Sequence, residues 1–189
     1  VMIQCFQQRN RERQYCSKVC CAQAVKNSIK IKEANPDANV YVLYRDMRTY
    51  GFKELKYMEA REKGVVFIRF RDGDDPTVYK ENGRLRVRVN DAVLNRELIF
   101  EPDLVALSVP VLASESSAAI AELLKAPLDT DGFFCEAHAK LRPVDFASEG
   151  LYLCGVAHSP KPLEENIQQA KAAAGRATIV LCKNYLERE

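Results

Sequence analysis

Four cysteines near the start of the chain constrain its fold more than any other feature. They follow the pattern C-x10-C-x3-C-C and are Cys5, Cys16, Cys20 and Cys21. Four thiolates are the usual complement of an iron–sulfur cluster or of a tetrahedral zinc ion. A helix would place Cys16 and Cys20 on one face, with Cys21 about 100° further round. The pattern predicts that a strand end at Cys5, a polar loop and a helix start at the double cysteine meet at one point.

Other roles are open to these thiols. A free cysteine is often a small buried hydrophobic residue. Disulfides are disfavoured because the chain has seven cysteines, an odd number, and adjacent cysteines rarely pair with each other. Zinc sites normally contain C-x2-C pairs, which are absent here. The spacing therefore favours a cluster over zinc, although it is not the common ferredoxin spacing.

The composition excludes several classes of protein. The chain is 47% hydrophobic and 29% charged, which is ordinary for a soluble globular protein. Its formal net charge of +2 creates no strong field for nucleic acid or acidic lipid. The longest apolar run, LVALSVPVLA, is too short to cross a bilayer, and no signal peptide is present. We therefore expect a cytoplasmic protein. The chain begins at Val1 in the middle of a predicted strand, so we also expect it to be a piece of a longer protein.

Hydrophobic patterns after the cysteines alternate between helix and strand. The predicted strand Val40–Asp46, helix Glu54–Lys63 and strand Val65–Phe70 have the spacing of a right-handed parallel βαβ unit. Residues 77–100 interrupt the alternation as a three-stranded antiparallel flap, in which Asn82-Gly83 marks a tight hairpin turn. We therefore predict a Rossmann-like three-layer α/β domain with a parallel sheet and an antiparallel flap. The predicted helices are Cys20–Glu33, Glu54–Lys63 and Glu115–Leu124, and the predicted parallel strands are Val40–Asp46, Val65–Phe70 and Asp103–Val109.

The end of the chain predicts a strand, a loop and a long helix. Strand Leu151–Gly155 runs into the loop Val156–Pro162, and the helix begins near Leu163. A glycine at a strand end, followed by a loop and a helix N-terminus, is a ready place for an anion or a carbonyl oxygen. The alanine-rich helix can pack closely against a sheet or a flat ligand. Its apolar stripe consists of Leu163, Ile167, Ala170, Ala174, Ala177 and Leu181.

Three blocks of the sequence are distinctive. The first joins IQC, YCSKVCCAQAVKNSIKIKE and YVLYRDMRTYG, the second is DGFFCEAHAKLRPVD, and the third is LYLCGVAHSPKPLEENIQQAKAAAGRA. Together they run along nearly the full chain and resemble the heterodisulfide reductase A-subunit family, whose members carry flavin and iron–sulfur centres in methanogens, sulfate reducers and other anaerobes. The resemblance implies a core similar to thioredoxin reductase, with two dinucleotide-binding halves.

The resemblance implies two cofactors, a [4Fe–4S] cluster and FAD. The cluster would be bound by Cys5, Cys16, Cys20 and Cys21. The family's GxGxxG for the FAD pyrophosphate is missing, so the chain would hold only part of the flavin site and be inactive alone. We expect residues 1–35 to form the cysteine segment, 40–145 a nucleotide-binding-like fold, and 146–189 a flavin-contacting strand and helix.

Particular residues are implied to contact the flavin. In thioredoxin-reductase-like proteins the corresponding strand ends in Gly-Asp, and the Asp binds the ribityl chain. Here the pair is Gly155-Val156, so a contact at position 156 would be made through the backbone. The alternatives are a tight turn at Gly155 and core packing at Ala170. The candidates are Gly155, Val156, Ala157, His158, Lys161, Gln169 and Ala170.

Lys26 is a candidate catalytic residue on the helix that begins at the double cysteine. The resemblance places it one to two turns from the cluster, where its charge would stabilise an anionic reduced flavin. The alternative is a solvated surface lysine. No role is assigned to His138, and the remaining cysteines, Cys135, Cys154 and Cys182, are interpreted as buried or incidental thiols.

The implied function is that of an oxidoreductase component which passes electrons between FAD and the cluster, with flavin-based bifurcation. Other heterodisulfide-reductase-like subunits, a hydrogenase or dehydrogenase that donates electrons, and a second copy in the full-length protein are the implied partners. One alternative is a pyridine-nucleotide-dependent reductase, disfavoured because Arg45, Asp46 and Arg48 stand where a glycine-rich turn is needed. The other is an interaction module with a structural zinc.

Overall fold

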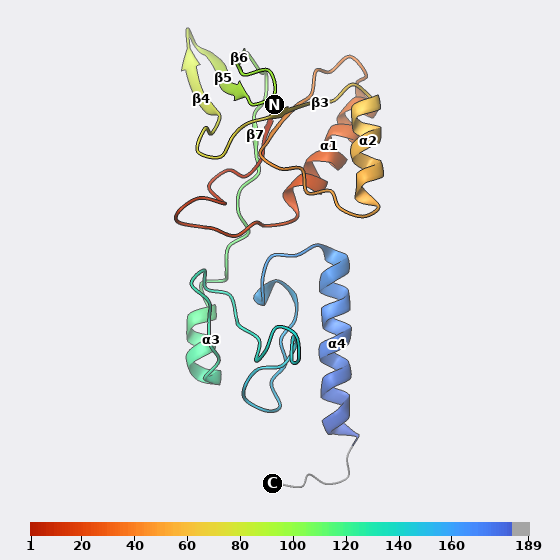
Figure 1. The fold of residues 1–189 in the computed structure, drawn as a ribbon, viewed down its shortest axis with the longest axis vertical. Coiled ribbons are helices and arrows are strands. Elements are labelled where there is room, and N and C mark those ends of the chain that lie inside the picture. The colour runs from red at the N-terminus through yellow and green to blue at the C-terminus, as the bar shows by residue number, and fades with distance from the viewer. Residues whose placement is uncertain (183–189) are drawn as a thin grey trace. The chain divides into compact units, whose positions relative to one another are not determined.

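The computed structural model describes residues 1–182, and residues 183–189 of the expected C-terminal segment lie outside the described part. The chain divides into two compact units, Val1–Pro110 and Val111–Glu189 (Figure 1). Within the described residues, both sheets belong to the first unit. No helix of the described chain is long and apolar enough to span a membrane.

A four-stranded parallel sheet forms the centre of the first unit. Its strands are β1 (Met2–Ile3), β2 (Tyr41–Tyr44), β3 (Val66–Arg69) and β7 (Ala106–Leu107), in the order β3-β2-β1-β7. The chain leaves β1 toward β2 and later returns to the other side of β1 as β7. The strand order therefore reverses at β1, and parallel sheets bind ligands at the carboxyl ends of strands beside such a reversal.

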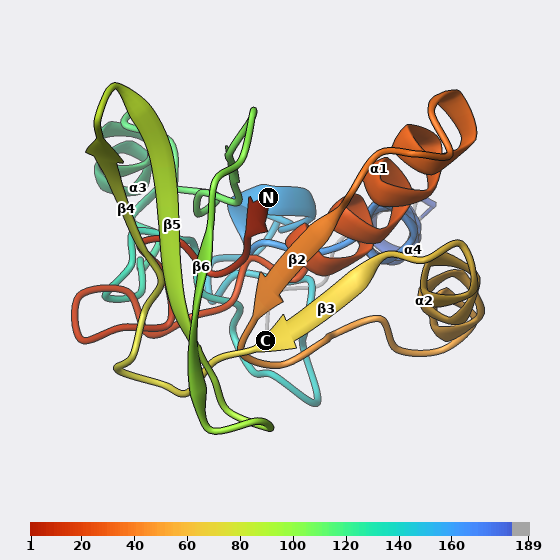
Figure 2. The same ribbon diagram turned by 90° about the horizontal axis from the view of Figure 1, so that it is seen from above.

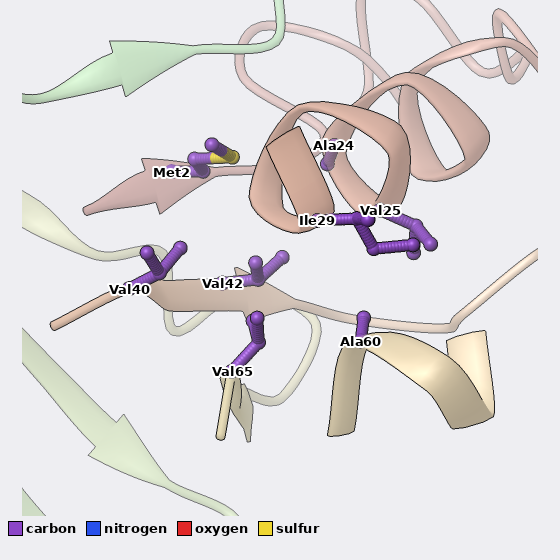
Figure 3. Packing of buried hydrophobic residues seen from close by; sticks show 8 residues of the cluster. All are labelled: Met2, Ala24, Val25, Ile29, Val40, Val42, Ala60 and Val65. Atoms are coloured by element: carbon purple, nitrogen blue, oxygen red, sulfur yellow. The ribbon is translucent and has the colours of Figure 1, made fainter. Parts of the chain in front are cut away.

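Two helices cover one face of this sheet. They are α1 (Cys20–Ala34) and α2 (Lys53–Glu62), and their ends agree with the predicted helices to within one residue. Val25 and Ile29 of α1 and Ala60 of α2 gather around Val42 of β2 (Figure 3). Because side chains alternate along a strand, Val42 packs under the helices while its neighbour Leu43 belongs to the cluster on the opposite face.

The antiparallel flap supplies the third layer. It consists of β4 (Thr77–Glu81), β5 (Arg84–Asp91) and β6 (Arg96–Phe100), in the order β4-β5-β6 (Figure 2). Val87 and Val89 of β5 are buried in one cluster with Ile3, Leu43 and Ile68 of the parallel sheet. The predicted fold class is thus confirmed, with the flap covering the face opposite the helices.

The second unit has less regular structure. It contains α3 (Ser117–Leu124), a short 3-10 helix (Gly155–Ala157) and α4 (Leu163–Leu181). The prediction of a strand at Leu151–Gly155 was wrong, because Tyr152 finds only a single bridge partner, Asp145. Helix α3 also begins two residues later than the predicted start at Glu115, with Ser116 as the residue that precedes it. The core of this unit is Ala121, Ala126, Phe134, Phe146 and Leu153.

An ion pair holds α4 to the irregular part of its unit. The guanidinium Nε of Arg176 lies 3.0 Å from Oδ1 and 3.2 Å from Oδ2 of the buried Asp145. Ala173, three residues earlier, is the buried residue of this helix. The predicted apolar stripe is exposed instead, with Leu163 71% and Ile167 45% exposed. That stripe is therefore not used in the core of the second unit.

Candidate functional site

The cysteine loop connects the carboxyl end of β1 to the start of α1. Cys5 follows β1, Cys16 lies in the loop, and Cys20 and Cys21 open the helix, as the spacing predicted. Four non-glycine residues of the loop, Cys5, Gln7, Arg9 and Lys18, have positive φ angles between 53° and 61°. Such conformations are uncommon outside glycine, and they persist only when the surrounding structure holds them.

A buried arginine, Arg45, fixes the loop from β2. Its guanidinium donates hydrogen bonds to the carbonyl oxygens of Arg9 at 2.9 Å and Gln8 at 2.6 Å, and it also pairs with Asp72. Arg9 in turn pairs with Asp46 at 2.6 Å, which lowers the pKa of that carboxyl group. These contacts explain how the loop keeps its positive φ angles without glycine.

Gln8 joins the two halves of the loop. Its side chain is 1% exposed, and its Oε1 accepts a hydrogen bond from the backbone N–H of Ser17 at 3.0 Å. Its Nε2 donates to the carbonyl oxygen of Ser108 at 3.2 Å and to the sulfur of Cys20 at 3.6 Å. One amide therefore links the segment after Cys5 to the segment around Cys20.

Burial is the main influence on the two thiols at the helix start. Burial raises the pKa of Cys20, against a hydrogen bond from Gln8 that lowers it, and Cys5 and Cys16 raise it further. Burial raises the pKa of Cys21 to about 11, again with contributions from the other three cysteines. Within residues 1–182, however, no three His, Cys, Asp or Glu side chains stand ready to hold a metal ion. A shared metal site at these thiols stays a prediction.

Selective alkylation tests this description of the metal-free loop. With a pKa of about 11, only about one Cys21 thiol in ten thousand is ionised at pH 7. We expect iodoacetamide to label the exposed Cys154 well before Cys21, and Cys21 labelling to accelerate as the pH rises toward 11. Fragment-ion mass spectrometry measures each site. Equal labelling of both thiols at pH 7 would contradict the burial of Cys21.

Lys26 lies on α1, exposed to solvent, and lines a groove of about 390 Å³ between α1 and α2. Ala22, Val25 and Ile29 also line this groove. Four lysines and two glutamates surround it, so its charge is positive overall. These are Lys26, Lys30, Lys53, Lys56, Glu33 and Glu59. The structure is compatible with both interpretations of Lys26, a surface lysine and a cation beside a bound group.

In the second unit, four of the predicted flavin-contacting residues form one hydrogen-bonded network. The buried Lys161 donates to the carbonyl oxygen of Gly155 at 3.1 Å, to Oε1 of Gln169 at 2.9 Å and to Nδ1 of His158 at 3.1 Å. Gln169 also accepts from the N–H of Gly155 at 2.9 Å. Gly155 has a φ of 77°, which glycine adopts without strain. The network fixes the turn into α4 from inside.

Sequence reasoning missed Glu136, which completes this network. Its Oε2 lies 2.8 Å from Nε2 of His158, and its pKa is lowered by its own backbone N–H and by His158. Nδ1 of His158 receives hydrogen bonds from Lys161 and from Nε2 of Gln169 at 2.6 Å, so the ring proton belongs on Nε2. The only available signal was the position of Glu136 two residues before His138 in the EAH block.

The remaining candidates of the second unit lie outside the network. Val156, Ala157 and Ala170 are exposed. Glu164 and Glu165 occupy the first turn of α4 and would repel an anion there. Of the two ligands that the sequence allowed at this helix start, a neutral carbonyl oxygen therefore fits better than an anion. His138 has a structural role, because its Nδ1 accepts hydrogen bonds from the backbone N–H groups of Lys140 and Leu141.

Comparison with solved structures shows the fold. Thioredoxin reductase from T. acidophilum superposes with a TM-score of 0.55 at 15% identity, covering 84% of this chain and 49% of that one. At this identity the similarity concerns the fold alone. No protein-family model matches the chain.

Comparison with curated proteins is more specific. The chain is 38% identical over 180 residues to the A-subunit of the Ferredoxin:CoB-CoM heterodisulfide reductase of Methanosarcina acetivorans, covering 94% of this chain and 22% of the relative. It is 37% identical over 197 residues to the iron-sulfur A-subunit of the CoB–CoM heterodisulfide reductase of Methanocaldococcus jannaschii, covering 100% of this chain and 29% of the relative. The chain thus spans about a quarter of the length of these relatives. By this similarity along nearly all of its residues, the chain belongs to the heterodisulfide reductase A-subunit family.

Proposed function

We propose that this chain is an electron-transferring part of a heterodisulfide-reductase-like flavoprotein, in which electrons pass between FAD and a [4Fe–4S] cluster. The observation that carries the proposal is the cysteine loop. Four thiols lie on the loop that follows β1 and on the first turn of α1, and burial raises the pKa of the two at the helix start, Cys20 and Cys21. Relatives named as iron-sulfur subunits add support.

The residues of the loop fit a cluster by their chemistry. Cys5, Cys16, Cys20 and Cys21 would hold it as thiolates, which is the usual ligand set of a [4Fe–4S] centre. A bound cluster supplies one-electron transfer. Its binding must release the protons that burial keeps on Cys20 and Cys21. Arg45 and Gln8 would keep the loop in place while the thiols converge.

The proposed contact with one edge of the flavin is made by the second unit. Lys161 and Gln169 hold the turn at Gly155, which leaves the exposed Val156, Ala157 and Ala170 as its outer surface. Added atoms at Gly155 would meet open space, so this surface has room for a ligand. The exposed Leu163 and Ile167 of α4 provide apolar area for a flat ring. FAD supplies two-electron chemistry when bound.

We also propose that the flavin of the complete protein performs electron bifurcation. The relative from Methanothermobacter marburgensis is named as the A-subunit of an H(2):CoB-CoM heterodisulfide,ferredoxin reductase, a name that pairs a heterodisulfide with ferredoxin. We propose that the complete protein acts in the cytoplasm as a dimer, with other reductase subunits and with a hydrogenase or dehydrogenase that donates electrons. The alternative of a structural zinc stays testable, because four thiols can also hold zinc.

Flavin reduction followed by rapid mixing tests the proposed electron path. In the full-length protein, reduced flavin should pass electrons to a cluster whose visible absorption bleaches. The Cys20→Ser variant should lose that bleaching, whereas the Cys135→Ser variant should keep it, because Cys135 lies in the other unit. Unchanged bleaching in Cys20→Ser would show that a cluster at these cysteines does not accept electrons from the flavin.

Lys26→Met tests the candidate catalytic lysine. The substitution keeps side-chain bulk and removes a charge that would favour the anionic reduced flavin. We expect the flavin potential to fall and cluster reduction kinetics to change. Lys30→Met is the matched control, since Lys30 is also exposed and lines the same groove one turn further along α1. If the two variants change the flavin potential and the reduction kinetics equally, or if neither changes them, Lys26 is an ordinary surface residue.

A further inference from the structure

Gln4 is a buried polar residue whose amide has an unused donor. It lies between β1 and Cys5, and its side chain is 1% exposed. Its Oε1 accepts a hydrogen bond from the hydroxyl of Ser108 at 3.0 Å. Its Nε2 is fully buried and finds no acceptor among residues 1–182. A buried donor without a partner costs free energy, so its presence calls for an explanation.

A cavity beside Gln4 brings this residue near a predicted cluster ligand. Gln4 and Cys20 both line a cavity of about 280 Å³ between α1 and strands β1 and β7. This is the crevice at which the strand order reverses. Gln23 and Asn27 of α1 also line it, but their amides bond to each other at 2.8 Å. Gln4, which carries the unused donor, therefore lines the same cavity as a predicted cluster ligand.

Gln8 already shows the interaction that we infer for Gln4. Its Nε2 donates a hydrogen bond to the sulfur of Cys20 at 3.6 Å. Ser108 connects the two glutamines, since its carbonyl accepts from Gln8 and its hydroxyl donates to Gln4. Ser108 thus holds two buried amides, one of which bonds the sulfur of Cys20 while the other belongs to a residue that shares a cavity with Cys20.

We propose that the side-chain amides of Gln4 and Gln8 donate hydrogen bonds to the sulfur atoms of the cluster at Cys20 and raise its reduction potential. The proposal rests on the proposed function, because it requires a cluster at this loop. Reduction adds negative charge, which spreads onto the sulfur atoms, and N–H donors stabilise the more negative form. Gln4 and Gln8 are positioning and tuning residues, and the ligands are the four thiolates.

Gln4→Met in the full-length protein tests this inference by potentiometric titration of the cluster's EPR signal. Methionine has nearly the same length but no donor. We expect iron content to stay the same and the ratio of reduced to oxidised cluster at a fixed solution potential to fall about tenfold, a shift of about 59 mV for one electron. Gln23→Met is the control, because Gln23 lines the same cavity with its amide already engaged. An unshifted potential in Gln4→Met overturns the proposal.

A second measurement covers the case in which Gln4→Met fails to fold or to hold the cluster. Full-length protein labelled with ¹⁵N in glutamine side chains should show ¹⁵N hyperfine coupling to the reduced cluster, and wild type without such coupling overturns the proposal. Measurements on the wild-type protein distinguish a failure of the proposed function from a failure of this inference. A wild-type protein with no cluster at these cysteines refutes the proposed function and this inference together. A cluster that is present but insensitive to both tests refutes this inference alone.

Discussion

Replacing Cys20 by alanine is expected to remove one [4Fe–4S] cluster from the full-length protein, lowering its iron content by about four per chain. Cys20 is a predicted ligand whose sulfur accepts a hydrogen bond from Gln8 and whose pKa is raised by burial. Three remaining thiolates leave one iron without its protein ligand, so the cluster becomes labile. Iron analysis and EPR of the reduced protein measure the loss.

Cys135→Ala is the matched control for this prediction. Cys135 is also partly buried, and burial raises its pKa too, but it belongs to the second unit. Its replacement should leave the iron content unchanged. The prediction is wrong if Cys20→Ala keeps all of its iron, or if both variants lose the same amount.

The second large effect is expected for Arg45→Met. Arg45 is 6% exposed, and its guanidinium satisfies the carbonyl oxygens of Gln8 and Arg9. Hydrogen bonds from charged donors contribute roughly 1.5–3 kcal/mol each, so their loss should destabilise the first unit by about 3 kcal/mol. The positive φ angles of the loop would also lose their support. Urea unfolding followed by circular dichroism measures the change.

Arg48→Met provides the comparison for Arg45. Arg48 is exposed three residues further along, and a surface substitution of this kind changes stability by less than about 0.5 kcal/mol. Cluster occupancy should fall in Arg45→Met and persist in Arg48→Met. Equal midpoints of urea unfolding for the two variants would show that Arg45 does not hold the loop.

The fold was largely predictable because its elements carry local patterns. Apolar runs such as VYVLY produce strands buried on both faces, and Asn82-Gly83 specifies the hairpin between β4 and β5. The strand predicted at Leu151–Gly155 failed for the opposite reason. Its composition suits a strand, but strands need neighbours, and the described part of the second unit offers only Asp145 as a bridge partner.

The polar support of the cysteine loop could not be predicted in the same way. Gln4, Gln8 and Arg45 are held by contacts with residues that are distant in the sequence, such as Ser108 and Asp72. No periodic pattern marks a polar residue that is buried by tertiary contacts. The cysteines were recognisable because four thiols at short spacing have few other uses, whereas glutamines and arginines occur throughout surfaces.

Iron and zinc analysis of the full-length protein, purified without oxygen, tests the central claim most directly. The comparison is between wild type and a variant in which Cys5, Cys16, Cys20 and Cys21 are all alanine. Our account predicts a difference of about four irons per chain and no difference in zinc. A difference of one zinc and no iron would contradict it, and would instead make the loop a structural zinc site.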